Sequence, residues 1–154
     1  MEFTCDKPLA PLTTLRVGGA ARLYADVTSL DDLWEAVKIA RERDLPLLPL
    51  GGGSNVLVAD GTLEALVAKI AMRGLEIDDR LTDTPTLVVS AGEEWDTAVA
   101  FAVAAGLWGI ENLSGIPGSA GAAPVQNIVA YGVELARHVR WVEVFDTQHG
   151  GVRT

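Results

Sequence analysis

The first fifty residues alternate between hydrophobic and polar positions with the periods of a strand, a helix and a second strand. Residues 21–27 form an apolar run typical of a strand. Ser29 then stands three positions before Asp32, the pattern of a helix N-cap. Apolar residues follow at helical spacing, and the expected inward face consists of Leu30, Leu33, Trp34, Val37 and Ala40. Residues 47–50 form a short apolar run after Pro46, so we expect a strand–helix–strand crossover.

The rest of the chain carries shorter regular segments. Strands are expected at residues 56–59, 65–70 and 86–91, with turns at Asp60-Gly61 and Asp78-Asp79. A second helix is predicted for residues 94–105, ending at Gly106. Residues 139–145 predict a strand that leads into a hairpin turn at 148–151, after which only three residues remain. We expect a single domain with α/β order at its start and mostly sheet in its middle.

Composition and charge exclude several classes of function. A formal net charge of −9 with a pI near 4.6 argues against a nucleic-acid partner. No apolar run approaches the roughly 20 residues that span a bilayer, and the first residues lack a signal-peptide pattern, so we expect a cytoplasmic protein that does not enter a membrane. Cys5 is the single cysteine, which excludes an internal disulfide. His138 and His149 lack the spacing of metal ligands, and no metal centre is expected.

The strongest local signal is the segment Gly51-Gly52-Gly53-Ser54-Asn55, directly after the expected strand 47–50. Glycine lets consecutive backbone N–H groups converge on an anion, and the serine and asparagine side chains add donors. A diphosphate fits such a turn, even though no lysine or arginine adjoins it in the sequence. The alternative is a tight glycine turn with no ligand.

Two familiar nucleotide-binding motifs do not match this segment. A Rossmann fingerprint requires a third glycine where Val56 stands, inside an expected strand. A Walker-type loop requires Gly-Lys-Ser or Gly-Lys-Thr, and the chain contains neither.

A second glycine-rich segment spans residues 109–124 and stays apolar, so we expect an ordered loop and not a flexible linker. Gly115, Gly118 and Gly121 recur at every third position, which lets a flat ring system lie against the backbone. Gln126 and Asn127 follow and are suited to bond the polar edge of such a ring. Taken alone, a close-packed crossing of two backbone segments explains these small residues equally well.

The combined motifs resemble those of the UDP-N-acetylenolpyruvoylglucosamine reductase family. In order, they are Thr-Thr-Leu-Arg-Val-Gly-Gly at 13–19, Pro-Leu-Gly-Gly-Gly-Ser-Asn-Val-Leu at 49–57, Glu-Asn-Leu-Ser-Gly-Ile-Pro-Gly-Ser at 111–119, Pro-Val-Gln-Asn at 124–127 and Ala-Tyr-Gly at 130–132. The resemblance covers residues 8–146, and the combination in one order is far more specific than either loop alone.

This resemblance implies a flavoprotein fold similar to that of vanillyl-alcohol oxidase, an α+β arrangement of two lobes with FAD between them. It implies that the cofactor is bound by Leu50, Gly51, Gly52, Gly53, Ser54, Asn55 and Val56 at the diphosphate, and by Ile116, Pro117, Gly118, Ser119, Ala122, Ala123, Gln126 and Asn127 along the flavin. Tyr131 is expected near the flavin and the substrate.

The family's reaction defines the expected partners. NADPH reduces FAD, and hydride passes to the enolpyruvyl group of UDP-N-acetylglucosamine enolpyruvate, which yields UDP-N-acetylmuramate for peptidoglycan. A positioned acid protonates the other alkene carbon. The family's catalytic arginine, serine and glutamate follow the region of resemblance. We therefore expect an FAD-binding domain over residues 1–154 that is incomplete at its C-terminus, lacks the substrate domain and is inactive alone.

No catalytic residue is assigned within the chain. Glu94, Glu111 and Glu134 are expected as capping, loop or surface groups. The four tryptophans are expected in the core, with Trp108 left open because it adjoins the second loop. Val129 replaces the glycine usual in the family, and a β-branched residue resists positive φ and close approach.

Two other functions remain as alternatives. One is a different oxidase of the same flavoprotein fold, such as a sugar or lactone oxidase, against which the Gln126-Asn127 and 130–132 motifs argue. The other is a non-catalytic module that binds FAD or another nucleotide. Bound oxidised flavin would absorb at about 450 nm and would identify the redox class.

Overall fold

The computed structural model describes residues 1–78 and 85–154. Strands and helices alternate without a repeating order. The helices are α1 (Leu30–Glu42), α2 (Trp95–Ala104) and α3 (Ala123–Gln126), with 3₁₀ turns η1 (Ala10–Leu12), η2 (Glu111–Leu113) and η3 (Leu135–Arg137). The strands are β1 (Thr4–Pro8), β2 (Ala20–Val27), β3 (Leu47–Leu50), β4 (Thr62–Ile70), β5 (Leu75–Asp78), β6 (Thr86–Val89), β7 (Val129–Ala130), β8 (Val133–Glu134), β9 (Val144–Phe145) and β10 (Val152–Arg153). No helix in the described part of the chain is long and apolar enough to cross a membrane.

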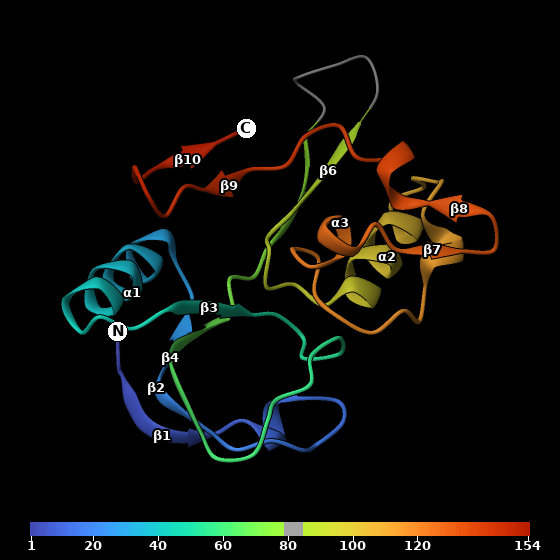
Figure 1. Cartoon of the computed structure of the whole chain (residues 1–154). Helices are drawn as coiled ribbons and strands as arrows, with labels where there is room; N and C mark the ends of the chain where they lie inside the picture. Colours follow the sequence, from blue (N-terminus) through green and yellow to red (C-terminus); the bar gives the residue numbers. More distant parts are fainter. Residues whose placement is uncertain (79–84) are drawn as a thin grey trace.

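A four-stranded sheet in the order β1-β2-β4-β3 organises the first half of the chain (Figure 1). β2, β4 and β3 run parallel, and β1 is antiparallel at the edge. The predicted strand–helix–strand unit is confirmed as β2-α1-β3, although β4 lies between its two strands. The carboxyl ends of three parallel strands therefore meet at one edge, where ligands commonly bind in such sheets.

Helix α1 begins at the predicted N-cap. The Ser29 hydroxyl accepts the Asp32 N–H at 3.1 Å, and the Asp32 carboxylate accepts the Ser29 N–H at 3.0 Å, which completes a capping box. The helix buries Ala36, Val37 and Ala40 against one face of the sheet. The buried face of α1 differs from the predicted one, because Leu30 and Trp34 were expected to face inward but remain nearly half exposed.

A second apolar cluster surrounds α2. It consists of Trp95, Val99, Leu113, Ala123 and Leu135, and the Trp95 indole N–H donates to the Leu113 carbonyl at 2.8 Å. Figure 1 shows α2, α3, β7 and β8 gathered together, apart from α1 and its sheet. The α2 helix ends as predicted at Gly106, whose φ of +74° favours glycine.

Several strand predictions require correction. Residues 56–59 form no strand, because the backbone there bonds across to Gly19, whose N–H donates to the Ala59 carbonyl at 2.9 Å. Of the predicted strand 139–145, only the last two residues form a strand, β9, which pairs with β10. Strands β1, β5, β7 and β8 were missed, while β4, β6 and the β9–β10 hairpin are confirmed. Asp79 of the expected turn lies outside the described residues.

Candidate functional site

The turn after β3 presents a run of free backbone donors. Within residues 1–78 and 85–154, no N–H group from Gly51 to Asn55 donates a hydrogen bond to another backbone or side-chain atom. Backbone N–H groups are strong donors that seek partners, and consecutive ones in a glycine turn are suited to an anion. This feature fits the diphosphate of a nucleotide cofactor.

The three glycines of this turn are required by close contacts with two other segments. A Cβ atom on Gly51 would lie 2.6 Å from the Ser119 hydroxyl oxygen, and one on Gly52 would lie 2.8 Å from the Gly118 Cα atom. Gly53 has φ of +73°, and its Cβ would lie 2.1 Å from the Leu12 carbonyl oxygen. The glycines thus also serve the close backbone crossing that the sequence left open as an alternative.

The opening motif at residues 13–19 braces the same turn. The Thr14 N–H donates to the Gly53 carbonyl at 3.0 Å, and the buried Thr13 hydroxyl donates to the Ala10 carbonyl at 3.2 Å. Gly18 and Gly19 lie directly against residues 58–61. The motif is therefore explained by its contacts with the turn and the segment that follows it.

The second loop is held by hydrogen bonds to the start of α2. The Trp95 N–H donates to the Gly118 carbonyl at 3.1 Å, the Ala120 N–H to the Glu93 carbonyl at 2.9 Å, and the Gly121 N–H to the Ala91 carbonyl at 2.8 Å. The prediction of an ordered loop is therefore confirmed, with η2 and α3 inside it. The loop meets the first glycine turn at Gly118 and Ser119, since the Ser54 hydroxyl donates to the Pro117 carbonyl at 3.1 Å.

A small hollow opens on the second loop beside this junction. Its lining comprises Trp95, Ile116, Pro117, Ser119, Ala122, Ala123, Gln126 and Ile128. Six of these were predicted to line the flavin. Ser119 is only 6% exposed, and its hydroxyl forms no hydrogen bond with any residue that the structure describes. Because this hydroxyl lines the hollow and has no protein partner among the described residues, it is available to an acceptor on a ligand.

Several predicted donors have other partners in this structure. The Ser54 hydroxyl is used by Pro117, as described above. The Asn127 side chain donates to the Glu134 carboxylate at 2.7 Å and accepts the Ala136 N–H at 3.0 Å, while its backbone is left-handed with φ of 44° at the end of α3. Leu50 is a core residue beneath the turn, so its side chain is not available to a ligand.

Tyr131 and Val129 belong to the short β7–β8 hairpin. Tyr131 and Gly132 have φ of 49° and 79° and form its turn, and the tyrosine is 89% exposed. Figure 1 shows this hairpin tip at the outer edge of the molecule, away from the turn after β3. Val129 sits in β7 without positive φ, so its branched side chain is accommodated.

Three charged side chains near the two loops were not identified from the sequence: Lys69, Arg73 and Glu93. Lys69 of β4 donates a hydrogen bond to the Gly51 carbonyl oxygen. The nearly buried Glu93 accepts hydrogen bonds from Arg73 at 3.0 Å and from the Gly74 N–H at 3.1 Å. Burial alone would raise the pKa of Glu93, but these hydrogen bonds outweigh it and lower the pKa below its ordinary value. Pairing across strands, which single-residue patterns do not reveal, brings Lys69 to the turn.

Tryptophans and carboxylates mostly occupy peripheral positions. Trp95 is in the core as predicted, but Trp34 and Trp141 are partly exposed, so the core prediction is wrong for these two. Trp108, which the sequence left open, is 88% exposed. Of the three carboxylates singled out from the sequence, Glu94 stands at the N-cap of α2 but forms no side-chain capping hydrogen bond, Glu111 accepts the Gly109 N–H in the second loop, and Glu134 accepts a hydrogen bond from the Asn127 amide.

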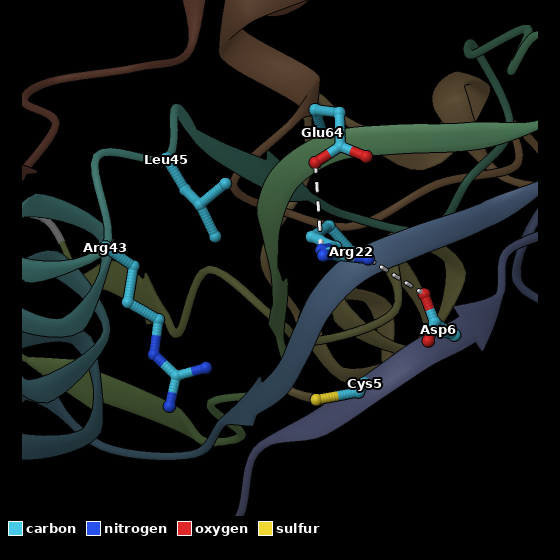
Figure 2. Close-up of a pocket in the computed structure, with 6 residues that line it drawn as sticks. All are labelled: Cys5, Asp6, Arg22, Arg43, Leu45 and Glu64. Carbon is cyan, nitrogen blue, oxygen red and sulfur yellow. Dashed lines mark ion pairs between the residues drawn. The ribbon is translucent and has the colours of Figure 1, made fainter.

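A cavity of about 550 Å³ lies elsewhere (Figure 2). It is lined by Cys5, Asp6, Arg22, Arg43, Leu45 and Glu64. Figure 2 shows Arg22 between Asp6 and Glu64, at 4.0 and 3.8 Å, with all three side chains more than half exposed. Such exposed pairs are weak. No residue of the two loops lines this cavity, and we place the functional site at the loops.

Comparison with known proteins identifies the family of the chain. A family model described as FAD binding domain matches residues 21–154. UDP-N-acetylenolpyruvoylglucosamine reductase of Salinispora arenicola is 46% identical over 142 residues, which are 92% of this chain and 39% of that protein. The reductase of the same name from Pseudomonas aeruginosa is 45% identical over 145 residues, which are 94% of this chain and 42% of that protein.

A solved structure extends the likeness to three dimensions. The crystal structure of UDP-N-acetylenolpyruvylglucosamine reductase from Thermus caldophilus matches with a TM-score of 0.74 and 30% identity, over 99% of this chain and 51% of that chain. The present chain spans about two fifths of the length of the curated relatives it matches. The predicted family resemblance, the mixed helix and strand content of an FAD-binding fold, and FAD as cofactor are confirmed.

Proposed function

The chain belongs to the FAD binding domain family, and from this premise we propose that it is the part of a UDP-N-acetylenolpyruvoylglucosamine reductase that holds FAD. The proposed whole reaction is NADPH-dependent reduction of UDP-N-acetylglucosamine enolpyruvate to UDP-N-acetylmuramate. When bound, the flavin supplies the hydride transfer. Residues of this chain bind and orient it.

One observation carries the proposal. The N–H groups from Gly51 to Asn55 are free in the described part of the chain, and this turn meets the second loop at Gly118 and Ser119, whose hydroxyl forms no hydrogen bond with a described residue. Leaving such donors unpaired is unfavourable, and a diphosphate offers several acceptor oxygens in one place. The proposed diphosphate site is therefore the junction of the two loops.

The isoalloxazine ring is proposed to lie over the small hollow of the second loop. Ile116, Ala122 and Ala123 offer apolar contact, and the exposed Gln126 is placed to bond a polar ring edge. We further propose a two-lobed arrangement of the vanillyl-alcohol oxidase type, with the α1 sheet and the α2 cluster as the lobes. Exposed Tyr131 is proposed to contact substrate.

The direct test is titration of the protein with FAD and with riboflavin, followed by flavin fluorescence and by absorbance at about 450 nm. Because only FAD carries the diphosphate, FAD should bind at least about tenfold more tightly, the gain expected from one charge-assisted hydrogen bond. Equal affinities for FAD and riboflavin would contradict a diphosphate site at this junction.

Two serine variants sharpen this test. Ser119→Ala should weaken FAD binding by about 1 to 3 kcal/mol without lowering the free energy of unfolding, because the hydroxyl has no partner among the described residues. Ser54→Ala should lower protein stability by about 1 kcal/mol, because its hydroxyl bonds the Pro117 carbonyl. Unchanged FAD affinity in Ser119→Ala would remove that residue from the site.

A further inference from the structure

Lys69 lies where three parallel strands end together. On β4 it pairs with Asp26 of β2 and with Leu50 of β3, the residue that precedes the glycine turn. The side chain is half-buried, and its ammonium donates a hydrogen bond to the Gly51 carbonyl oxygen. A cation therefore contacts the first glycine of the turn whose N–H groups are free.

The charge of Lys69 is only partly compensated by its surroundings. Among residues 1–78 and 85–154 it forms no contact ion pair. Asp26 is its strand neighbour, and that carboxylate already accepts the Tyr24 hydroxyl at 2.6 Å. Burial lowers the pKa of Lys69, the Asp26 charge opposes this, and Arg73 lowers the pKa further. Because burial disfavours the charged ammonium, a bound anion nearby would stabilise it.

We propose that Lys69 is the positioning residue of the diphosphate site, an inference that rests on the function proposed above. The peptide between Gly51 and Gly52 is trans, so its N–H points opposite to its C=O. By holding the Gly51 carbonyl, the ammonium turns the Gly52 N–H away from itself, on the outer side of the turn. Its positive charge also attracts the diphosphate.

The test compares Lys69→Met, Lys69→Arg and the control Lys38→Met. Lys38 is an exposed lysine of α1 whose ammonium pairs with Glu42 at 3.8 Å. Lys69→Met should weaken FAD binding by about 10- to 100-fold, the range for a lost charge-assisted hydrogen bond. Riboflavin affinity should change by less than about threefold, since riboflavin lacks the diphosphate. Lys69→Arg should restore most of the FAD preference, and Lys38→Met should match the wild type.

The ratio of FAD to riboflavin affinity separates the possible results. A wild type without FAD preference contradicts the proposed function itself. A wild type that prefers FAD, with the same preference in Lys69→Met, overturns the role of Lys69 alone. An equal loss of both ligands in Lys69→Met also overturns it, because that is general damage to the fold. If Lys69→Met does not fold, Lys69→Gln against Lys69→Arg gives the same comparison, and equal FAD preference in these two overturns the role of the charge.

Discussion

Replacement of Gly53 by alanine tests the packing of the glycine turn against the opening segment, with Gly61 as a matched control. Both glycines have positive φ, +73° and +88°. A Cβ on Gly53 would lie 2.1 Å from the Leu12 carbonyl oxygen and 3.0 Å from the Thr13 Cα atom. Nothing lies within 4 Å of a Cβ on Gly61. The two variants therefore share the conformational cost and differ in the steric one.

The magnitudes follow from these two terms. A left-handed backbone costs a non-glycine residue about 1 to 2 kcal/mol, which both variants incur. Overpacking against atoms that cannot move freely adds about 1 to 3 kcal/mol for Gly53→Ala alone. At about 2 to 4 °C per kcal/mol for a chain of this size, Gly53→Ala should melt about 2 to 12 °C below Gly61→Ala.

Urea denaturation followed by circular dichroism measures the free energy of unfolding of both variants. FAD titration on the same samples should show weaker binding for Gly53→Ala, because the Thr14 N–H bond to the Gly53 carbonyl is disturbed. Gly61→Ala should keep the wild-type affinity. Equal stability of the two variants would refute the close approach of the turn to residues 12–13.

Three further predictions concern stability. Trp95→Phe leaves the buried Leu113 carbonyl without its donor and should lower the free energy of unfolding by about 1 to 3 kcal/mol. Trp108→Phe should change it by less than about 0.5 kcal/mol, as measured by urea denaturation. Equal losses in the two variants would contradict the assigned core. The lowered pKa of Glu93 means that its contribution to stability is present above the ordinary glutamate pKa of about 4.3 and is lost as the pH falls through the folded-state pKa. Glu93→Gln should therefore be less stable than the wild type at pH 7, and the gap in unfolding free energy should close in acid; a gap independent of pH would oppose this. Ser29→Ala removes the α1 cap and should lower the melting temperature by about 2 to 4 °C, for a loss of about 1 kcal/mol; an unchanged melting temperature would argue against the cap.

Local patterns in the sequence predicted the elements that local interactions stabilise. The α1 helix follows from Ser29 and the apolar spacing after it, and α2 ends at Gly106 because glycine readily takes the left-handed conformation there. The motifs around Gly51 and Gly118 indicated an anion and a flat ring without any knowledge of the fold. Such patterns are visible in the sequence because each depends on residues close in the chain.

Strand pairing was much less predictable. Residues 56–59 have the composition of a strand but bond across to Gly19, while the charged β1 pairs with β2 at the sheet edge. Pairing depends on which distant segment supplies the partner, and that information is absent from a local window. The exposure of Trp108 and Trp34 has the same origin, since burial requires a neighbour from elsewhere in the chain.

The sequence by itself determined the family resemblance, the cofactor and the two loops that we propose to hold it. Tertiary structure alone decided that these loops touch, with the Ser54 hydroxyl bonded to the Pro117 carbonyl and Gly52 against Gly118. It also brought the Lys69 ammonium to the Gly51 carbonyl oxygen and the Ser119 hydroxyl close to Gly51. The physical reason is that adjacent residues determine the conformation of a turn. The charge and the hydrogen-bond donors around the turn come from strands and loops that meet only when the chain folds.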